Sequence, residues 1–118
     1  MPKPAGVLIC SDQRGSQFLE ACRRAGVSVP NELAVVGVDN DEPLCEVCLP
    51  PLSSVEPGHL NVGYQAAALL DALLRGDSPP RKPLQLQPLE TVTRLSSDAL
   101  AVADARIGIC LLYTSRCV

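Results

Sequence analysis

Two short polar clusters contain the side chains best suited to binding a ligand. Ser11 and Asp12 follow one apolar run of the sequence, and Asp39 and Asn40 follow another. Hydroxyls, carboxylates and amides donate and accept the hydrogen bonds that vicinal hydroxyl groups require, so a neutral sugar or polyol is a natural ligand for such residues. We therefore take Ser11, Asp12, Asp39 and Asn40 as candidate ligand-binding residues.

Two other interpretations of these clusters remain open. Asp12 can simply cap a helix, with the acidic run at 39–42 forming a solvated turn. Alternatively, Asp12 and Asp39 can hold Mg²⁺, as paired aspartates do in phosphoryl-transfer enzymes. No lysine or phosphate-cradling glycine loop accompanies the aspartates, and the glycines form neither GxGxxG nor GxxxxGK[ST]. We expect no metal and no cofactor.

Nucleophilic catalysis has little support in the sequence. The chain contains one histidine, His59, and any Ser/His/Asp or Cys/His arrangement would depend on it. No nucleophile lies beside it in the sequence, so we expect His59 to be a surface or helix-capping residue. The chain is predicted not to be an enzyme.

The strongest local cysteine signal is the CxxC formed by Cys45 and Cys48. A zinc site requires a second pair or a Cys/His pair at finger-like spacing, which the other cysteines and His59 do not provide. A thioredoxin-like motif would begin a helix, whereas the surrounding prolines predict an irregular segment from 45 to 51. We expect these cysteines to be structural.

The two clusters lie at the ends of predicted strands. The apolar run at 7–10 predicts a strand, and a helix with one apolar face follows it. This helix is expected to end near Ala25, because Gly26 can adopt a left-handed conformation and Pro30 prevents the helix from continuing. The run Leu33–Val38 is apolar without alternation, as in strands of parallel sheets. This βαβ pattern predicts an α/β fold with both clusters at one sheet edge.

The second half of the sequence predicts an incomplete fold. A short extended piece at 53–55 precedes a second helix at about 60–74, and a further extended segment is expected within 84–95. Apolar residues occupy about two thirds of the circumference of this second helix. So wide an apolar arc needs cover on more than one side, which the other predicted elements cannot supply.

Several ordered motifs occur at characteristic separations: Cys-Ser-Asp-Gln-Arg-Gly (10–15), Ala-Cys-Arg-Arg-Ala-Gly-Val-Ser-Val-Pro (21–30), Leu-Ala-Val-Val-Gly-Val-Asp-Asn-Asp-Glu (33–42), Pro-Pro-Leu-Ser-Ser-Val (50–55) and Gly-Tyr-Gln-Ala-Ala (63–67). Together they resemble the later part of the sugar-sensing domain of lac and galactose repressor-type regulators. The likeness is greatest to the xylose operon regulators, whose sensor is followed by an AraC-type DNA-binding domain.

The resemblance implies a partial periplasmic-binding-protein-like (type I) fold, a parallel sheet with flanking helices, of which only the later half is present. It covers residues 4–97, which we interpret as a partial sugar-sensor domain in a truncated fragment. Residues 98–118 match no later family segment and resemble translated adaptor or read-through sequence, so we expect an artefactual or disordered tail.

The resemblance also assigns roles to the candidate residues. Asp39 matches the sugar-contacting aspartate at the end of the family's Val-Gly-x-Asp strand. Ser11 stands where many members have a sugar-contacting asparagine, and Asp12 matches the aspartate that follows it. Asn40 is a further candidate.

We therefore expect the effector-binding fragment of a bacterial, cytoplasmic, sugar-responsive transcription regulator. Its effector would be a pentose such as xylose, held between two lobes. The parent protein would be a homodimer and would bind DNA through a domain absent from this chain. The net charge of −3, with basic residues gathered only in pairs, is consistent with a chain that is not itself a DNA-binding module.

Two alternatives belong to other classes. One is the late half of a periplasmic sugar-transport binding protein, which would need an export signal upstream. The other is a small Mg²⁺-dependent enzyme using Asp12 and Asp39. No uninterrupted apolar stretch approaches the roughly 20 residues of a membrane span, so no membrane association is expected.

Overall fold

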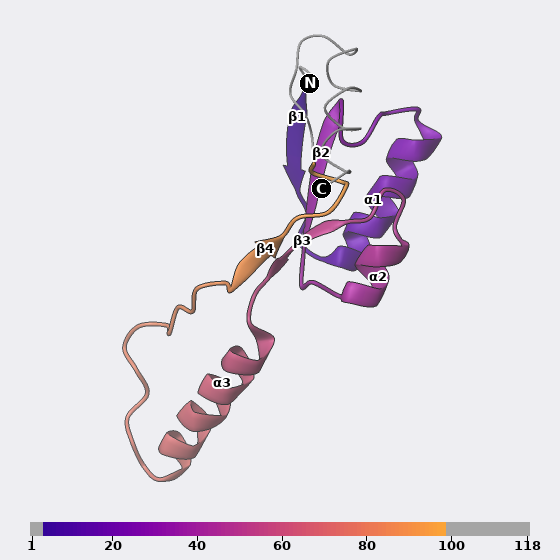
Figure 1. Ribbon diagram of the computed structural model, residues 1–118. Helices are drawn as coiled ribbons and strands as arrows, with labels where there is room; N and C mark the ends of the chain where they lie inside the picture. The colour runs from indigo at the N-terminus through magenta and orange to yellow at the C-terminus, as the bar shows by residue number, and fades with distance from the viewer. Residues whose placement is uncertain (1–3, 99–118) are drawn as a thin grey trace.

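The computed structural model describes residues 4–98 of the chain (Figure 1). The tail predicted for 98–118 therefore lies outside the described residues, except for Asp98. The elements in chain order are β1 (Ala5–Leu8), α1 (Asp12–Arg24), β2 (Leu33–Val38), α2 (Glu42–Val47), β3 (Ser53–Glu56), α3 (His59–Leu74) and β4 (Glu90–Val92).

The strands form one sheet in the order β1-β2-β3-β4. The pairs β1–β2 and β2–β3 are parallel, which confirms the predicted α/β class and the βαβ unit. The expectation of a parallel sheet is wrong for β4, which runs antiparallel to β3. The reason is topological: β3 leads out of the sheet to α3, and β4 brings the chain back alongside it (Figure 1).

Helix α1 begins and ends where its sequence indicates. Ser11 is the N-cap residue, and its hydroxyl accepts a hydrogen bond from the backbone N–H of Arg14 at 3.4 Å. The helix ends at Ala25, and Gly26 follows with φ of 67°, a left-handed conformation that glycine adopts without steric cost. The predicted end of this helix is confirmed.

Helix α2 includes the first half of the CxxC, so the prediction of an irregular segment from 45 to 51 is wrong for 45–47, whereas residues 48–51 lie outside any helix or strand, as predicted. The Asp41 carboxylate caps α2 by accepting from the backbone N–H of Leu44 at 3.3 Å. Pro43 lies in the first turn, where the missing N–H breaks no helical hydrogen bond. The neighbouring proline therefore starts this helix instead of preventing it.

The core lies between the sheet and the two helices α1 and α2, which cover the same side of the sheet (Figure 1). Its buried members are Leu19, Val35, Cys45, Cys48 and Leu52. The exposed fraction is 0% for Cys45 and 6% for Cys48, and both thiols are free. These values support the prediction that the CxxC is structural.

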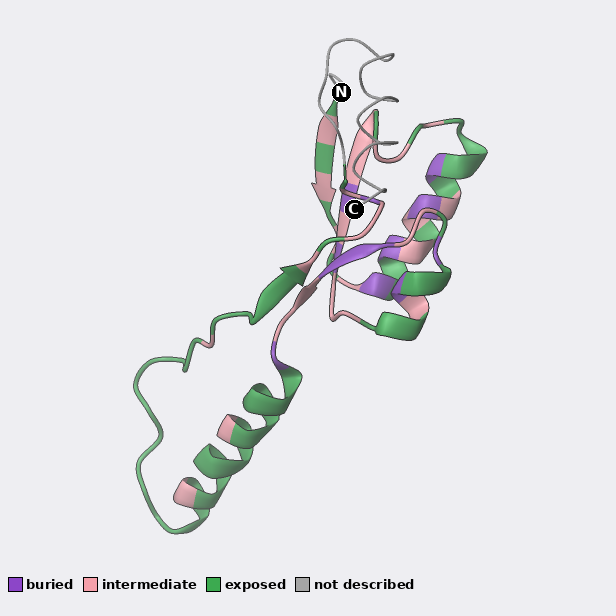
Figure 2. Cartoon of the chain, in the orientation of Figure 1, coloured by how far each residue is buried: buried purple, intermediate pink, exposed green. Residues whose placement is uncertain are grey.

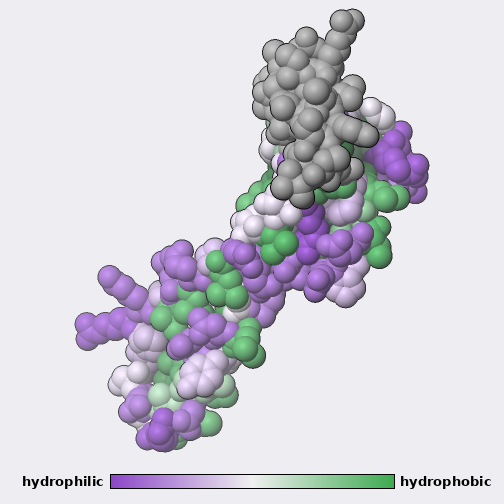
Figure 3. All heavy atoms as spheres, in the orientation of Figure 1, coloured by the Kyte–Doolittle hydropathy of each residue, from purple (hydrophilic) through white to green (hydrophobic). Residues whose placement is uncertain are grey.

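Helix α3 stands apart from this core and has no buried residue (Figure 2). Leu60 is 91% exposed and Leu74 80% exposed, and other apolar side chains along α3 are also exposed (Figure 3). The radius of gyration is 19.0 Å, compared with about 13.5 Å for a compact domain of this length. The predicted wide apolar arc is therefore present and uncovered in the described part of the chain.

We expect the isolated chain to self-associate through α3 and to unfold without a sharp transition. Replacing both Leu70 and Leu74 with Gln should shift the sedimentation profile toward monomer, because these exposed leucines contribute apolar surface that water solvates poorly. The control Leu19→Gln changes a core residue that is 2% exposed and should unfold the chain. A sharp thermal transition of the unsubstituted monomer would contradict the prediction.

Gly37 allows α1 to approach β2 closely. A Cβ built on Gly37 would collide with Oδ1 of Asp12 and would lie 3.1 Å from Cδ2 of Leu52. Both neighbours are buried, so neither side chain can move into open solvent. The small residue in the middle of β2 is therefore required by packing.

The variant Gly37→Ala should lose about 1–3 kcal/mol of unfolding free energy, since the added methyl group overpacks a filled site and displaces a hydrogen-bonded carboxylate. Gly6→Ala in β1 is the matched control, because nothing lies within 4 Å of its added Cβ. Urea unfolding of both variants measures the difference. Equal stability of the two would refute the packing argument.

Candidate functional site

The structure brings the two polar clusters together at one edge of the sheet. Because β1 and β2 are parallel, the segments that follow them leave the same edge. The backbone N–H of Asp41 donates to Oδ2 of Asp12 at 2.8 Å and joins the two clusters directly. We call residues 39–41 the Asp39 turn.

Asp12 is 1% exposed, and both of its carboxylate oxygens accept hydrogen bonds. Oδ1 accepts from the Ser54 hydroxyl at 2.6 Å, and Oδ2 accepts from the Asp41 backbone. Asp12 also lies in the first turn of α1, where the helix dipole favours a negative charge. The structure thus places Asp12 beneath the Asp39 turn, inside the protein.

The Asp39 turn has an unusual backbone. Asp39 has φ of 109° and Asn40 has φ of 51°, values that side-chain-bearing residues rarely adopt. Such conformations cost roughly 1–3 kcal/mol each and persist only where surrounding contacts impose them.

Three successive backbone N–H groups supply that constraint. The N–H of Asp39 donates to the carbonyl of Val55 at 3.0 Å, and that of Asn40 donates to the hydroxyl of Ser54 at 3.1 Å. The N–H of Asp41 donates to Asp12, as described above. Residues of strand β3 and the start of α1 therefore fix the backbone of the turn.

Arg94 fixes the same turn from the side and was not identified from the sequence. Both terminal guanidinium nitrogens donate to Oδ1 of Asn40 at 3.1 Å, and one also donates to the carbonyl of Leu52. Nε donates to Glu46 at 2.6 Å, and the Arg94 side chain is only 10% exposed. The available sequence signal was one cationic residue between the apolar residues Val92 and Leu95.

Asp39 is a partly exposed member of the turn. Its side chain is 45% exposed, and Oδ1 lies 3.6 Å from Nε2 of His59. His59 is the first residue of α3 and is 62% exposed, which agrees with the expectation of a surface residue, although Gly58 occupies the N-cap position. The structure therefore adds His59 to the candidate site.

The other two predicted residues differ in what they can still bind. The Ser11 hydroxyl accepts from the backbone of Arg14 and keeps its own proton available for donation. The Asn40 side chain is engaged on both ends, since Nδ2 donates to Glu56 at 3.4 Å and Oδ1 accepts from Arg94. Asp39 and Ser11 thus retain hydrogen-bonding capacity, whereas Asn40 is committed within the protein.

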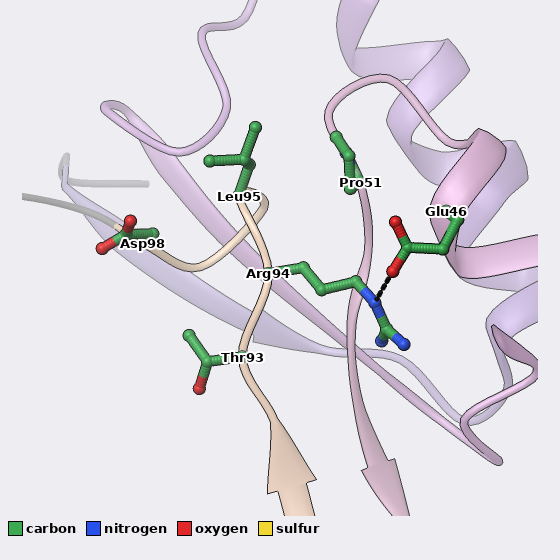
Figure 4. A pocket seen from close by; sticks show the side chains of 6 residues that line it. All are labelled: Glu46, Pro51, Thr93, Arg94, Leu95 and Asp98. Atoms are coloured by element: carbon green, nitrogen blue, oxygen red, sulfur yellow. Dashed lines mark hydrogen bonds and ion pairs between the residues drawn. The ribbon is translucent and has the colours of Figure 1, made fainter. Parts of the chain in front are cut away.

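Arg94 also lines a hollow of about 310 Å³ (Figure 4). Its lining residues are Glu46, Pro51, Thr93, Arg94, Leu95 and Asp98. None of the four predicted ligand-binding residues lines it. Arg94, which lines the hollow, connects it to the Asp39 turn through the hydrogen bonds to Asn40.

The described residues give no support to a metal centre. Between residues 4 and 98, no group of three or more His, Cys, Asp or Glu side chains is arranged to hold a metal ion. Asp12, which the magnesium alternative requires, already has a hydrogen-bond donor on each oxygen. Over the same residues, no helix has the length and apolar character that crossing a membrane requires.

Residues 1–97 match the model of the periplasmic binding protein-like domain. The chain belongs to this family. The solved structure of a xylose-binding transcription activator aligns with 96% of the chain at a TM-score of 0.75 and 31% identity. The family and the α/β fold agree with the expectations from the sequence.

Two further relatives extend the comparison. The chain is 38% identical over 104 residues to the xylose operon regulatory protein of Haemophilus influenzae, an alignment that covers 88% of this chain and 27% of the relative. The lac repressor dimer bound to operator and an anti-inducer aligns over 80% of this chain and 32% of that one, at 26% identity and a TM-score of 0.64. The xylose-binding activator is covered to 30%. The chain thus spans about a third or less of the length of these proteins.

Burial makes the Cys45 thiol unreactive. Loss of solvation, together with a hydrogen bond to the Asp12 carboxylate, raises the pKa of Cys45 to about 12. At pH 8 only about one thiol in ten thousand would then be the reactive thiolate.

We expect iodoacetamide at pH 8 to alkylate the exposed Cys10 while Cys45 stays unmodified, as read by peptide mass spectrometry. In concentrated guanidinium chloride the two cysteines should react at similar rates, which controls for peptide recovery. Comparable labelling of both in the folded chain would show that Cys45 is not buried beside Asp12.

Proposed function

We propose that this chain is the effector-binding part of a bacterial sugar-responsive transcription regulator and that the effector is a pentose such as xylose. The proposal is supported by the likeness to a xylose operon regulatory protein and to a xylose-binding transcription activator. The structural observation that carries it is the Asp39 turn, where a strained backbone holds the half-exposed carboxylate of Asp39 at the carboxyl edge of the sheet.

In this proposal Asp39 accepts hydrogen bonds from sugar hydroxyls. Its carboxylate is half-exposed, and the surrounding hydrogen bonds fix its backbone before any ligand arrives, so little conformational entropy is lost on binding. Ser11 donates from its free O–H, and His59 approaches Asp39 from α3. Asp12 and Asn40 act from within, by holding the turn in place.

The sugar would lie between two lobes, of which this chain supplies part of one and the beginning of the other. Helix α3, with its uncovered apolar side chains, would belong to the second lobe, and the β3–β4 pair would connect the two. A sugar that contacts Asp39 and His59 together favours the closed arrangement. Closure then shifts the population of a DNA-bound state, provided that the effector has different affinities for the two states.

We further propose a cytoplasmic homodimer that binds DNA through a domain outside this chain, of the AraC type found in xylose operon regulators. A dimer and operator binding are seen in the similar lac repressor structure, which supports this kind of partner. The chain would carry no catalytic activity and need no cofactor.

A chimera provides the direct test of effector binding. Residues 1–97 of this chain would replace the matching segment of the Haemophilus influenzae regulator, which restores a complete sensor. Isothermal titration calorimetry with xylose, ribose, glucose and lactose would then measure affinity. Saturable binding of a pentose in preference to the hexose and the disaccharide supports the proposal, and absence of pentose binding by a folded chimera refutes it.

In the same chimera, Asp39→Ala should weaken pentose binding by about 1–3 kcal/mol, because sugar hydroxyls lose their acceptor inside a closed cleft. Asp77→Ala is the matched control, since Asp77 is also an exposed aspartate but lies in the linker after α3. Calorimetry reads both variants. Equal affinities would remove Asp39 from the binding site.

A further inference from the structure

The guanidinium of Arg94 donates four hydrogen bonds, more than any other charged side chain between residues 4 and 98. It donates to the side chain of Asn40, to the carbonyl of Leu52 and to the carboxylate of Glu46, and its side chain is 10% exposed. A nearly buried cation with so many acceptors is ordered by all of them. It also orders them, because each acceptor would lose a charge-assisted hydrogen bond if Arg94 moved.

Asn40 connects Arg94 to the strained backbone. The oxygen of its side chain accepts from both terminal guanidinium nitrogens of Arg94, while its own backbone N–H donates to Ser54. Asn40 and the adjacent Asp39 both have positive φ. If the side-chain anchor were lost, the turn could relax toward the negative φ values that asparagine and aspartate prefer.

The segment that carries Arg94 is anchored independently of its side chain. The backbone N–H of Arg94 donates to the Ser53 hydroxyl at 2.7 Å, and its carbonyl accepts from the same hydroxyl. Ser96 is fully buried and bonds to Val35 and to the backbone N–H of Ser53. Changing the Arg94 side chain therefore leaves the path of this segment in place, which makes a substitution there informative.

We propose that Arg94 is a positioning residue for effector binding. It touches no sugar; it fixes Asn40 and thereby keeps the carboxylate of Asp39 in its binding orientation. Arg94 lies two residues after the end of β4, the strand that returns from α3. The same side chain thus ties the orientation of Asp39 to the position of the β3–β4 connection. The predicted effect of Arg94 on sugar affinity rests on the proposed function, whereas the predicted effect of Arg94 on the Asp39 turn can be measured without a ligand.

The test compares three single variants in the chimera described above. Arg94→Lys keeps the positive charge but cannot supply the forked pair of donors to Asn40. Asn40→Ala removes the acceptor itself. Glu46→Gln is the matched control, because it removes the negative charge of the 57%-exposed partner of Arg94 and leaves the Asn40 contacts intact.

The first readout is amide hydrogen exchange without ligand, resolved at residues 39–41. We expect exchange there to accelerate by about tenfold in Arg94→Lys and in Asn40→Ala, with the amides of α1 unchanged as the internal reference for global stability. Glu46→Gln should change little. If Arg94→Lys accelerates exchange at the turn no more than Glu46→Gln does, the inference is overturned.

The second readout is the Kd for the pentose that the unsubstituted chimera binds. It should rise by about tenfold in Arg94→Lys and in Asn40→Ala, and the double variant should lose little more, since the two residues act through one contact. A loosened turn with unchanged affinity would overturn the role of Arg94 in binding. Accelerated exchange at the turn in a chimera that binds no pentose would instead refute the proposed effector and support the link between Arg94 and the turn.

Discussion

The buried carboxylate of Asp12 is the interaction on which the rest of the structure depends. A charge in a protein interior is tolerated only when donors satisfy it, and here Ser54 of β3 and the backbone of Asp41 supply them. Gly37 leaves the space that the carboxylate occupies, and the Cys45 thiol of α2 lies beside it. One side chain at the start of α1 therefore ties together β2, β3, α2 and the Asp39 turn.

The parts of the fold that local spacing determines were predictable. Strand β2 and helix α1 follow directly from an unbroken apolar run and from capping residues such as Ser11. Helix α2 was not predicted because Pro43 reads as a helix breaker unless its place in the first turn is known. The antiparallel direction of β4 depends on where α3 carries the chain, which no local pattern of residues 84–95 specifies.

The candidate site likewise has features that the sequence predicted and features that only the tertiary structure shows. Asp12 and Asp39 were both placed at the carboxyl edge of the sheet by the sequence, but sequence could not show which of them points inward. Arg94 was missed because its partner Asn40 is 54 residues away in the chain. His59 approaches Asp39 only through the course of the chain after β3. Residue type and position along a strand therefore located the site, and tertiary contacts assigned the roles within it.

The long separation between Asn40 and Arg94 also has a kinetic consequence. The hydrophobic core is built from residues up to Leu52, whereas the contact that completes the Asp39 turn closes a loop of 54 residues through α3 and the proline-rich linker. Contacts that close long loops form late, because the entropy of closure must be overcome first. The turn would therefore mature after the core has folded, and a chain leaving the ribosome would acquire its binding geometry only once residue 94 had emerged and docked.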